Sequence, residues 1–442
     1  MKNLKTNIYF KLTSILVIVL LLLIPVSRIK SLITEREGRQ QEAIFEVNSL
    51  WASEQTLGGP VLSIPYEREA TETLREGGTT RTVRQTDHIH ILPQSLRIEG
   101  TLVPQKRKRG IFEVVVYTAQ LQFSGVFALP AADELKMAGQ SVHFDRATLS
   151  LGLNDLRGIE DPVVLQWNDQ THDFDPGLEV RDILKNGLST PVGLDAENTR
   201  EYAFSFNLQI RGSRNMMFVP VGKITEVEIN SAWPDPSFGG AFLPSQRQVN
   251  DQGFSAQWKV LHLNRSFPQI WTGNQYNLQE AAFGVSLLLP VDHYMKSFRS
   301  VKYAILIVGF TFLVFFFVEV LNKVFIHPIQ YILVGMALII FYTLLISISE
   351  HLSFNAAFVI SLLATLGLVA TYVKAVVKSH LITGIVVGVL AILYGFVFVI
   401  IQLQDFALLF GSLGLFLILA LVMYFSRKID WYNVYGEKNE EV

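Results

Sequence analysis

The sequence predicts an α+β membrane protein with an N-terminal transmembrane helix, a large β-rich (sandwich-like) exported domain and a C-terminal bundle of five transmembrane helices. Three observations lead to this fold class. Apolar runs of membrane-spanning length occur near the N-terminus and fill the last third of the chain. The region between them alternates polar and apolar residues with the period of a β-strand. Charge is concentrated there, since residues 28–300 contain 27 of the 37 Lys and Arg and 32 of the 39 Asp and Glu.

The composition excludes several classes of protein. Of the 442 residues, 50% are hydrophobic and 17% are charged, whereas soluble domains contain about 25% charged residues. The net charge of −2 argues against a chain that binds nucleic acid through bulk positive charge. The absence of cysteine excludes disulfides, thiol catalysis, iron–sulfur clusters and cysteine-ligated zinc.

The first apolar run, Leu12–Val26, has 15 residues and is short for a span of about 20. Lys11 precedes it, and a lysine can extend its side chain to the interface, so that residues 8–10 lengthen the span. The run also fits the apolar region of a signal peptide, but residues 25–28 lack a small-x-small cleavage pattern. We therefore expect an uncleaved anchor, and helical periodicity over Ile33–Val47 predicts that its helix continues.

The middle region has the alternation of strands with one solvent-exposed face. The predicted strands lie at residues 112–123, 148–153, 202–210, 226–230 and 254–262. Arg68–Arg84 is rich in Thr, Glu, Gly and Arg and indicates a mobile polar loop.

Five further apolar runs follow in the last third, each long enough to cross a bilayer. They are Tyr303–Leu321, Ile329–Ile348, Ala356–Val373, Leu381–Ile401 and Phe406–Phe425. The short turns between them make neighbouring helices antiparallel.

The distribution of Lys and Arg predicts the orientation in the membrane. With the N-terminus inside, the inner segments contain nine basic residues, and the outer loops Ser349–Asn355 and Gln402–Asp405 contain none. We therefore expect a multi-pass membrane protein with both termini in the cytoplasm and residues about 31–298 on the far side of the membrane. The predicted division is a membrane anchor at 1–30, an exported β-rich domain at 31–298, a transmembrane bundle at 299–428 and a cytoplasmic tail at 429–442.

Ionisable residues at the ends of the spans are candidates for function, because charge is costly in hydrocarbon. Glu319 and His327 flank one inner turn and could share a proton or a hydrogen bond, unless both extend to the headgroups. Glu350 and His351 mark the outer end of the next helix, where polar residues also simply meet water. No carboxylate lies in mid-span to connect the two pairs as a proton path.

The middle region has three further candidates. The run Lys106–Arg109, which ends at Arg109, would suit a phosphate-bearing lipid or form a solvated hairpin. Trp233, in an aromatic and proline-rich loop, could recognise a partner or cap the core. His88 and His90 have the spacing of metal ligands on one strand face, but no third ligand is near them in sequence, and we expect no metal site.

Short motifs are distributed along the whole chain. In the middle region they include Ser49-Leu50-Trp51, Gly59-Pro60-Val61-Leu62, Val219-Pro220-Val221-Gly222, Ser231-Ala232-Trp233-Pro234 and Leu263-Asn264-Arg265. In the last third they are His327-Pro328-Ile329-Gln330-Tyr331, Ser349-Glu350-His351 and Asp430-Trp431-Tyr432. Together they resemble the CreD family of inner-membrane proteins. The resemblance implies an anchor helix, an exported domain and a helical bundle, and a link to envelope integrity, stress response and colicin tolerance. It supplies no catalytic residues.

No serine-hydrolase elbow, zinc-protease motif, phosphate loop or dinucleotide fingerprint occurs in the sequence. We therefore expect no enzymatic activity, no catalytic residues and no cofactor. The favoured function is support of cell envelope integrity, in which the periplasmic domain binds an envelope component or partner protein and the bundle anchors it or transmits its state. A transporter or lipid-handling protein is the alternative. The expected partners are the lipid bilayer and an envelope lipid, a glycan or another envelope protein, and not nucleic acid.

Overall fold

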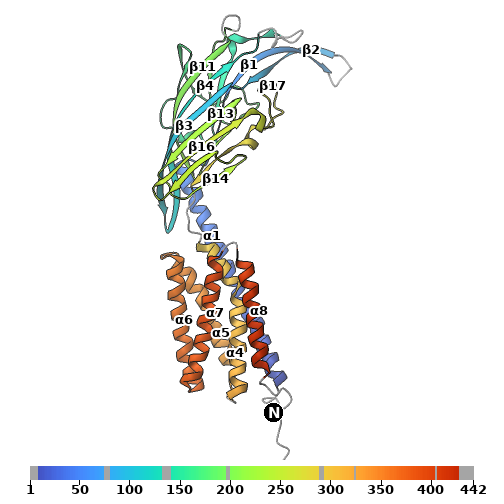
Figure 1. The fold of residues 1–442 in the computed structure, drawn as a ribbon. Helices are drawn as coiled ribbons and strands as arrows, with labels where there is room; N and C mark the ends of the chain where they lie inside the picture. Colours follow the sequence, from blue (N-terminus) through green and yellow to red (C-terminus); the bar gives the residue numbers. More distant parts are fainter. Residues whose placement is uncertain are drawn as a thin grey trace, which may run out of the picture. The chain divides into compact units, whose positions relative to one another are not determined.

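The structure, a computed structural model, describes residues 8–73, 80–131, 141–195, 200–287, 293–322, 325–403 and 406–427 (Figure 1). The chain divides into two compact units. We call residues 1–41 and 291–442 the membrane unit, and residues 42–290 the β unit.

The membrane unit is helical. Its helices in the described ranges are α1 (Ile8–Leu50, which continues into the β unit), α3 (His293–Lys302), α4 (Ala304–Asn322), α5 (Pro328–Ser349), α6 (Phe354–Val377), α7 (His380–Gln402) and α8 (Ala407–Ser426). Six helical stretches of the described chain are long and apolar enough to cross a membrane, with α3 and α4 forming one of them. The predicted N-terminal helix and five C-terminal helices are confirmed.

Local sequence signals set the helix ends. Ser353 and Ser379 cap α6 and α7, because each hydroxyl oxygen accepts a hydrogen bond from a backbone N–H three residues later, at 3.4 and 3.5 Å. Lys378 ends α6 in a left-handed conformation with φ 55°. Pro328 is tolerated at the first position of α5, where its missing N–H would have no intrahelical partner.

The helix α1 is a single element of 43 residues, so the predicted continuation beyond the first apolar run is confirmed. Pro25 lies inside it, a position that membrane helices tolerate because neighbouring groups satisfy the freed carbonyl. The exposed apolar residues of its first half, such as Leu16 and Leu20, suit a lipid surrounding.

The β unit contains two sheets. In the described residues the ten-stranded sheet consists of β1 (Gln55–Thr73), β2 (Thr80–Ile91), β5 (Ser141–Val142), β6 (Thr148–Gly152), β9 (Asp175–Pro176), β10 (Gly187–Pro191), β12 (Asn215–Phe218), β14 (Pro236–Gly240), β17 (Ile270–Thr272) and β18 (Phe283–Leu287). The eight-stranded sheet consists of β3 (Ser95–Arg109), β4 (Phe112–Ala128), β7 (Val164–Trp167), β8 (Gln170–Asp173), β11 (Glu201–Ser213), β13 (Ile224–Ser231), β15 (Gln246–Asn250) and β16 (Gly253–Leu261).

The eight-stranded sheet has the order β15-β16-β13-β3-β4-β11-β7-β8. Long strands form its centre (Figure 1), where β4 pairs antiparallel with β3 and with β11, while β13 and β3 are parallel. The predicted strands at 112–123, 202–210, 226–230 and 254–262 lie in β4, β11, β13 and β16, although residue 262 already begins a short 3₁₀ turn.

Side chains from both sheets build one apolar core. Phe123 and Phe206 stack at 4.6 Å between ring centroids on neighbouring strands of the eight-stranded sheet. Trp258 of that sheet contacts Phe283 of the ten-stranded sheet at 5.7 Å. The alternating residues that face this core account for the predicted sandwich-like packing.

Two details of the sequence interpretation were wrong. The strand β6 was expected to have one solvent-exposed face, but all five of its residues are buried. It lies inside the sheet, between β1 on one side and β10 on the other. Arg68–Arg84 is not a loop throughout, since β1 continues to Thr73 and β2 begins at Thr80, and only 74–79 lie outside the described residues. Cross-strand charge pairs support this hairpin, with Arg68 2.6 Å from Asp87.

Candidate functional site

A carboxylate, a tyrosine and a cation meet in the membrane unit where α1, α4 and α5 come together. The Lys11 ammonium lies 3.0 Å from the Glu319 carboxylate, and their side chains are 12% and 3% exposed. The Tyr331 hydroxyl donates to Glu319 at 3.2 Å. Lys11 also donates to the Ile326 carbonyl and lies over the rings of Phe325 and Tyr331, at 4.9 and 5.1 Å. We call this group the Lys11 cluster.

The Lys11 cluster does not include His327, which the sequence offered as one possible partner of Glu319. The exposed His327 caps α5, because its Nδ1 accepts the Ile329 N–H at 3.3 Å and its own N–H donates to Gln330 at 2.9 Å. Both of these hydrogen bonds of His327 are to residues of its own helix, and neither is to Glu319. The charged partner of Glu319 comes instead from α1, far away in sequence, and chain proximity could not reveal it.

A second cluster of the same composition involves Glu350. Its carboxylate accepts a hydrogen bond from the Tyr294 hydroxyl at 3.1 Å and lies 3.7 Å from the Arg36 guanidinium. His351 is exposed just beyond the end of α5. The carboxylate is therefore paired with a basic residue of α1 and not with the neighbouring histidine. We call this group the Arg36 cluster.

The helix α1 supplies the cation of both clusters. Lys11 and Arg36 are 25 residues apart, which corresponds to about 38 Å along a helix. This distance exceeds the hydrocarbon thickness of about 30 Å. Each cluster can therefore lie at one interface, where charged groups cost less than at the centre of the bilayer.

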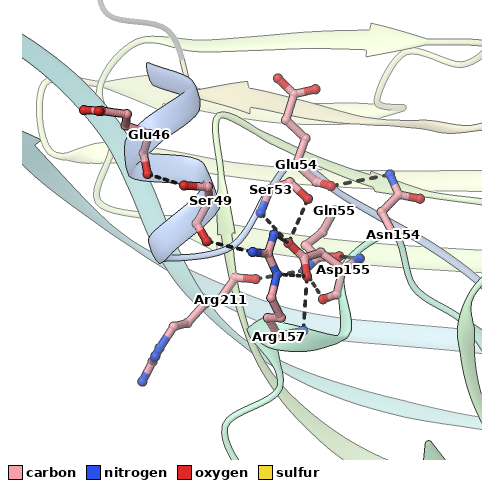
Figure 2. Close-up of polar contacts among 9 residues, drawn as sticks. All are labelled: Glu46, Ser49, Ser53, Glu54, Gln55, Asn154, Asp155, Arg157 and Arg211. Atoms are coloured by element: carbon pink, nitrogen blue, oxygen red, sulfur yellow. Dashed lines mark hydrogen bonds and ion pairs between the residues drawn. The ribbon is translucent and has the colours of Figure 1, made fainter. Parts of the chain in front are cut away.

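The last turn of α1, which is part of the β unit, is held by a polar network around Asp155 (Figure 2). The Asp155 carboxylate accepts hydrogen bonds from the N–H and hydroxyl of Ser53, both at 3.0 Å, and from Arg157 at 2.7 and 2.9 Å. Arg157 also donates to the carbonyl of Ser49 in α1 at 2.7 Å. The Arg157 guanidinium and these donors hold the pKa of Asp155 far below its usual range.

Gln55 extends this network into the sheets. Its side-chain amide donates to the carbonyls of Asp155 and Arg211, at 2.9 and 3.1 Å, and accepts the Asp155 N–H at 3.2 Å. It is fully buried, so each of these bonds replaces one to water. Sequence analysis missed this network, since a single Asp beside a turn has no distinctive pattern.

The basic run of β3 is paired within the chain. Arg109 binds Glu46 of α1 at 2.6 Å and lowers the pKa of that exposed carboxyl. Lys108 lies 3.4 Å from Glu113, and Arg107 stacks on Trp51 at 4.9 Å. This arrangement resembles the solvated hairpin more than a phosphate site. Trp233 is only 7% exposed and belongs to the core, which favours the core-capping interpretation.

His88 and His90 share a carboxylate that sequence proximity did not indicate. Asp182 lies 3.4 Å from His88 Nδ1 and 3.4 Å from His90 Nε2. His90 Nδ1 is 3.0 Å from the Ser63 hydroxyl, and both residues are buried. Burial is the main cause that lowers the pKa of His90 to about 4. No group of three or more His, Cys, Asp or Glu among the described residues is arranged to hold a metal ion.

These features define a multi-span membrane protein with one large β unit between its first span and its last five. The family described as "Inner membrane protein CreD" matches residues 7–432. The chain is 32% identical over 435 residues to Inner membrane protein CreD of Escherichia coli (strain K12), which covers 97% of this chain and 95% of that protein. The chain therefore belongs to the CreD family of inner-membrane proteins.

Proposed function

We propose that this protein supports the integrity of the cell envelope and has no enzymatic activity. In this proposal the β unit lies in the periplasm and binds an envelope component or a partner protein. The membrane unit anchors the β unit and transmits its binding state.

The attachment of α1 at both of its ends supports this proposal. Lys11 and Arg36 engage carboxylates of the membrane unit, and Ser49 engages Arg157 of the β unit. An anchor needs only apolar residues, and ion pairs in a membrane helix are costly to bury. A helix that makes directional polar contacts in both units is suited to transmit a conformational change from the β unit to the membrane unit.

The state of the polar clusters supports the non-enzymatic part of the proposal. Ser63, His90 and Asp182 have the residue types of a catalytic triad, but the Ser63 side chain is 1% exposed and no substrate carbonyl can reach its oxygen. Of the candidates in the membrane unit, His327 caps α5, and Glu319 and Glu350 are engaged in ion pairs.

In-cell cross-linking of the full-length protein tests the proposed function. We expect a photo-reactive residue placed at Gln122 in the β unit to capture a glycan or protein that co-purifies in mild detergent. The same reagent at the lipid-exposed position Leu16 of α1 is the control and should capture only phospholipid. Absence of any adduct at several exposed β-unit positions would contradict binding by the β unit.

Reporter fusions test the proposed orientation. Fusions after Lys378 should report the cytoplasm, because the Lys-rich short segments are retained inside. Fusions after Ser353 and Asn274 should report the periplasm. A periplasmic signal at Lys378 would overturn the arrangement with both termini in the cytoplasm.

Lipid handling is a second candidate function, and an apolar groove favours it. The groove has a volume of 490 Å³ and lies between α4, α7 and α8. Its lining includes Phe310, Phe317, Phe396 and Phe410, and it suits a hydrocarbon chain. A phospholipid retained at a fixed ratio by the purified protein, with no other component, would favour this function over the first.

A further inference from the structure

The outer face of the eight-stranded sheet has a row of polar side chains that crosses five strands in register. Gln257 of β16 is opposite Glu228 of β13, which is opposite Glu99 of β3. Glu99 is opposite Gln122 of β4, and Gln122 is opposite Asn207 of β11. All five are partly or fully exposed. With strands about 4.8 Å apart, the row is about 19 Å long.

A second row runs parallel to the first on four of these strands, at positions two residues away on each strand. It consists of Asn230, Thr101, Gln120 and Gln209, which are again opposite one another on β13, β3, β4 and β11. The two rows together present amide, hydroxyl and carboxylate groups, which include both donors and acceptors of hydrogen bonds.

The surface is hollowed along these rows. A depression of 530 Å³ is lined by both rows, including Glu99, Gln122 and Asn207. A second depression of 330 Å³ shares Glu99 and Glu228 with it, and a third of 310 Å³ shares Gln122 and Asn207. Because neighbouring depressions share residues, they lie side by side across the strands, and we call the three together the groove.

The charges of the groove exclude an anionic ligand. The central depression has three carboxylates, Glu99, Asp161 and Glu228, and no basic residue in its lining. Arg97 and Lys259 lie in the neighbouring depression and are paired with Glu99 and Glu226, at 2.5 and 2.8 Å. The linings of the two depressions thus contain four carboxylates and two basic residues, and a phosphate-rich polymer or an anionic lipid surface would meet an excess of negative charge here.

We propose that this groove binds an uncharged polysaccharide chain, which lies across the strands and is held by hydrogen bonds to the two rows. Amide side chains can donate to one hydroxyl and accept from the next, and carboxylates accept hydroxyl and amide N–H groups strongly. The inference rests on the proposed function of the β unit and names the class of its ligand.

The test uses full-length protein in detergent and two forms of one polymer. Peptidoglycan sacculi provide glycan strands with stem peptides. Amidase treatment, followed by conversion of the freed lactyl carboxylates to methylamides, provides soluble and uncharged bare strands. We expect the wild-type protein to bind the bare strands in microscale thermophoresis. The variant Gln122→Ala/Asn207→Ala should bind about tenfold more weakly, because it loses two sets of hydrogen bonds.

The matched control is Gln248→Ala/Gln170→Ala, which removes two exposed glutamines of β15 and β8 that lie outside the groove. It should bind like the wild type. Failure of the wild-type protein to bind bare strands, or equal weakening in both double variants, would overturn the proposal. Binding only to strands with stem peptides would also overturn it, because recognition would then involve the peptides.

These outcomes separate this inference from the proposed function. If the β unit is cross-linked to a protein partner while the bare strands fail to bind, the proposed function stands and the polysaccharide site is wrong. If neither a partner nor a glycan is captured, both fail.

Discussion

Replacing Glu319 with glutamine is expected to lower the free energy of unfolding of the membrane unit by about 3 kcal/mol. The substitution leaves the Lys11 ammonium, only 12% exposed, without the carboxylate that lies 3.0 Å away. Removing one partner of a buried ion pair is costly because the other charge stays buried and uncompensated. Denaturant unfolding of the purified full-length protein in detergent measures the loss.

Three comparisons make this prediction specific. Lys11→Met/Glu319→Gln should be more stable than Glu319→Gln alone, because neither charge remains buried. Glu350→Gln should cost about 1 kcal/mol or less, since Arg36 is 35% exposed and 3.7 Å distant. His327→Ala, which removes a helix cap, should also cost about 1 kcal/mol. If Glu319→Gln unfolds like the wild type, the Lys11 cluster does not fix α1, and the proposed transmission loses its basis.

The stability of the β unit is expected to fall between pH 6.5 and pH 4 because of His90. The native state holds this imidazole neutral, with a pKa lowered to about 4, whereas the unfolded chain binds its proton near pH 6.5. The unfolded state therefore binds more protons in this window, so the free energy of unfolding decreases as the pH falls. The shift corresponds to about 3 kcal/mol, a net value in which Asp182 already offsets part of the effect of burial.

Trp271, whose ring centroid is 5.4 Å from that of His90, provides a fluorescence signal for this measurement. His90→Gln should remove most of the pH dependence in the window, while His262→Gln, on a short turn after β16, should retain it. Asp155 contributes in a different range. Its depressed pKa adds stability that is lost only when the pH falls below the usual Asp value of about 3.9. A flat stability profile from pH 6.5 to 4 in the wild type would contradict the assignment to His90.

The sequence predicted the helices of the membrane unit well, because hydrophobic length and capping are local properties. The end of α5 at Ser349 and its start at Pro328 follow from apolar runs and from a proline at a first-turn position. The partners of Glu319 and Glu350 could not be predicted in the same way. Both come from α1 and depend on how helices distant in sequence pack together.

The β unit shows the same division between local and distant information. Alternation of polar and apolar residues correctly predicted strands with one solvent-exposed face. The same pattern gave a wrong prediction for β6, which is buried between β1 and β10. His88 and His90 were noticed from their spacing, while Asp182 was not, because it reaches them from a segment about ninety residues later. The sequence showed an aromatic residue at Trp233 in a proline-rich loop, but only the tertiary structure shows that this side chain is buried in the core.

The Lys11 cluster constrains the order in which the protein is made. Glu319 is synthesised 308 residues after Lys11, which at 5–20 residues per second corresponds to about 15–60 s. During this time the first helix is inserted without its counter-charge, and the whole β unit is synthesised before the pair can form. Until Glu319 is inserted, the Lys11 ammonium has to stay at the membrane surface, where a lysine side chain can reach water. Closure of the Lys11 cluster is therefore a late step of biogenesis, and it can take place only in chains that have completed the β unit.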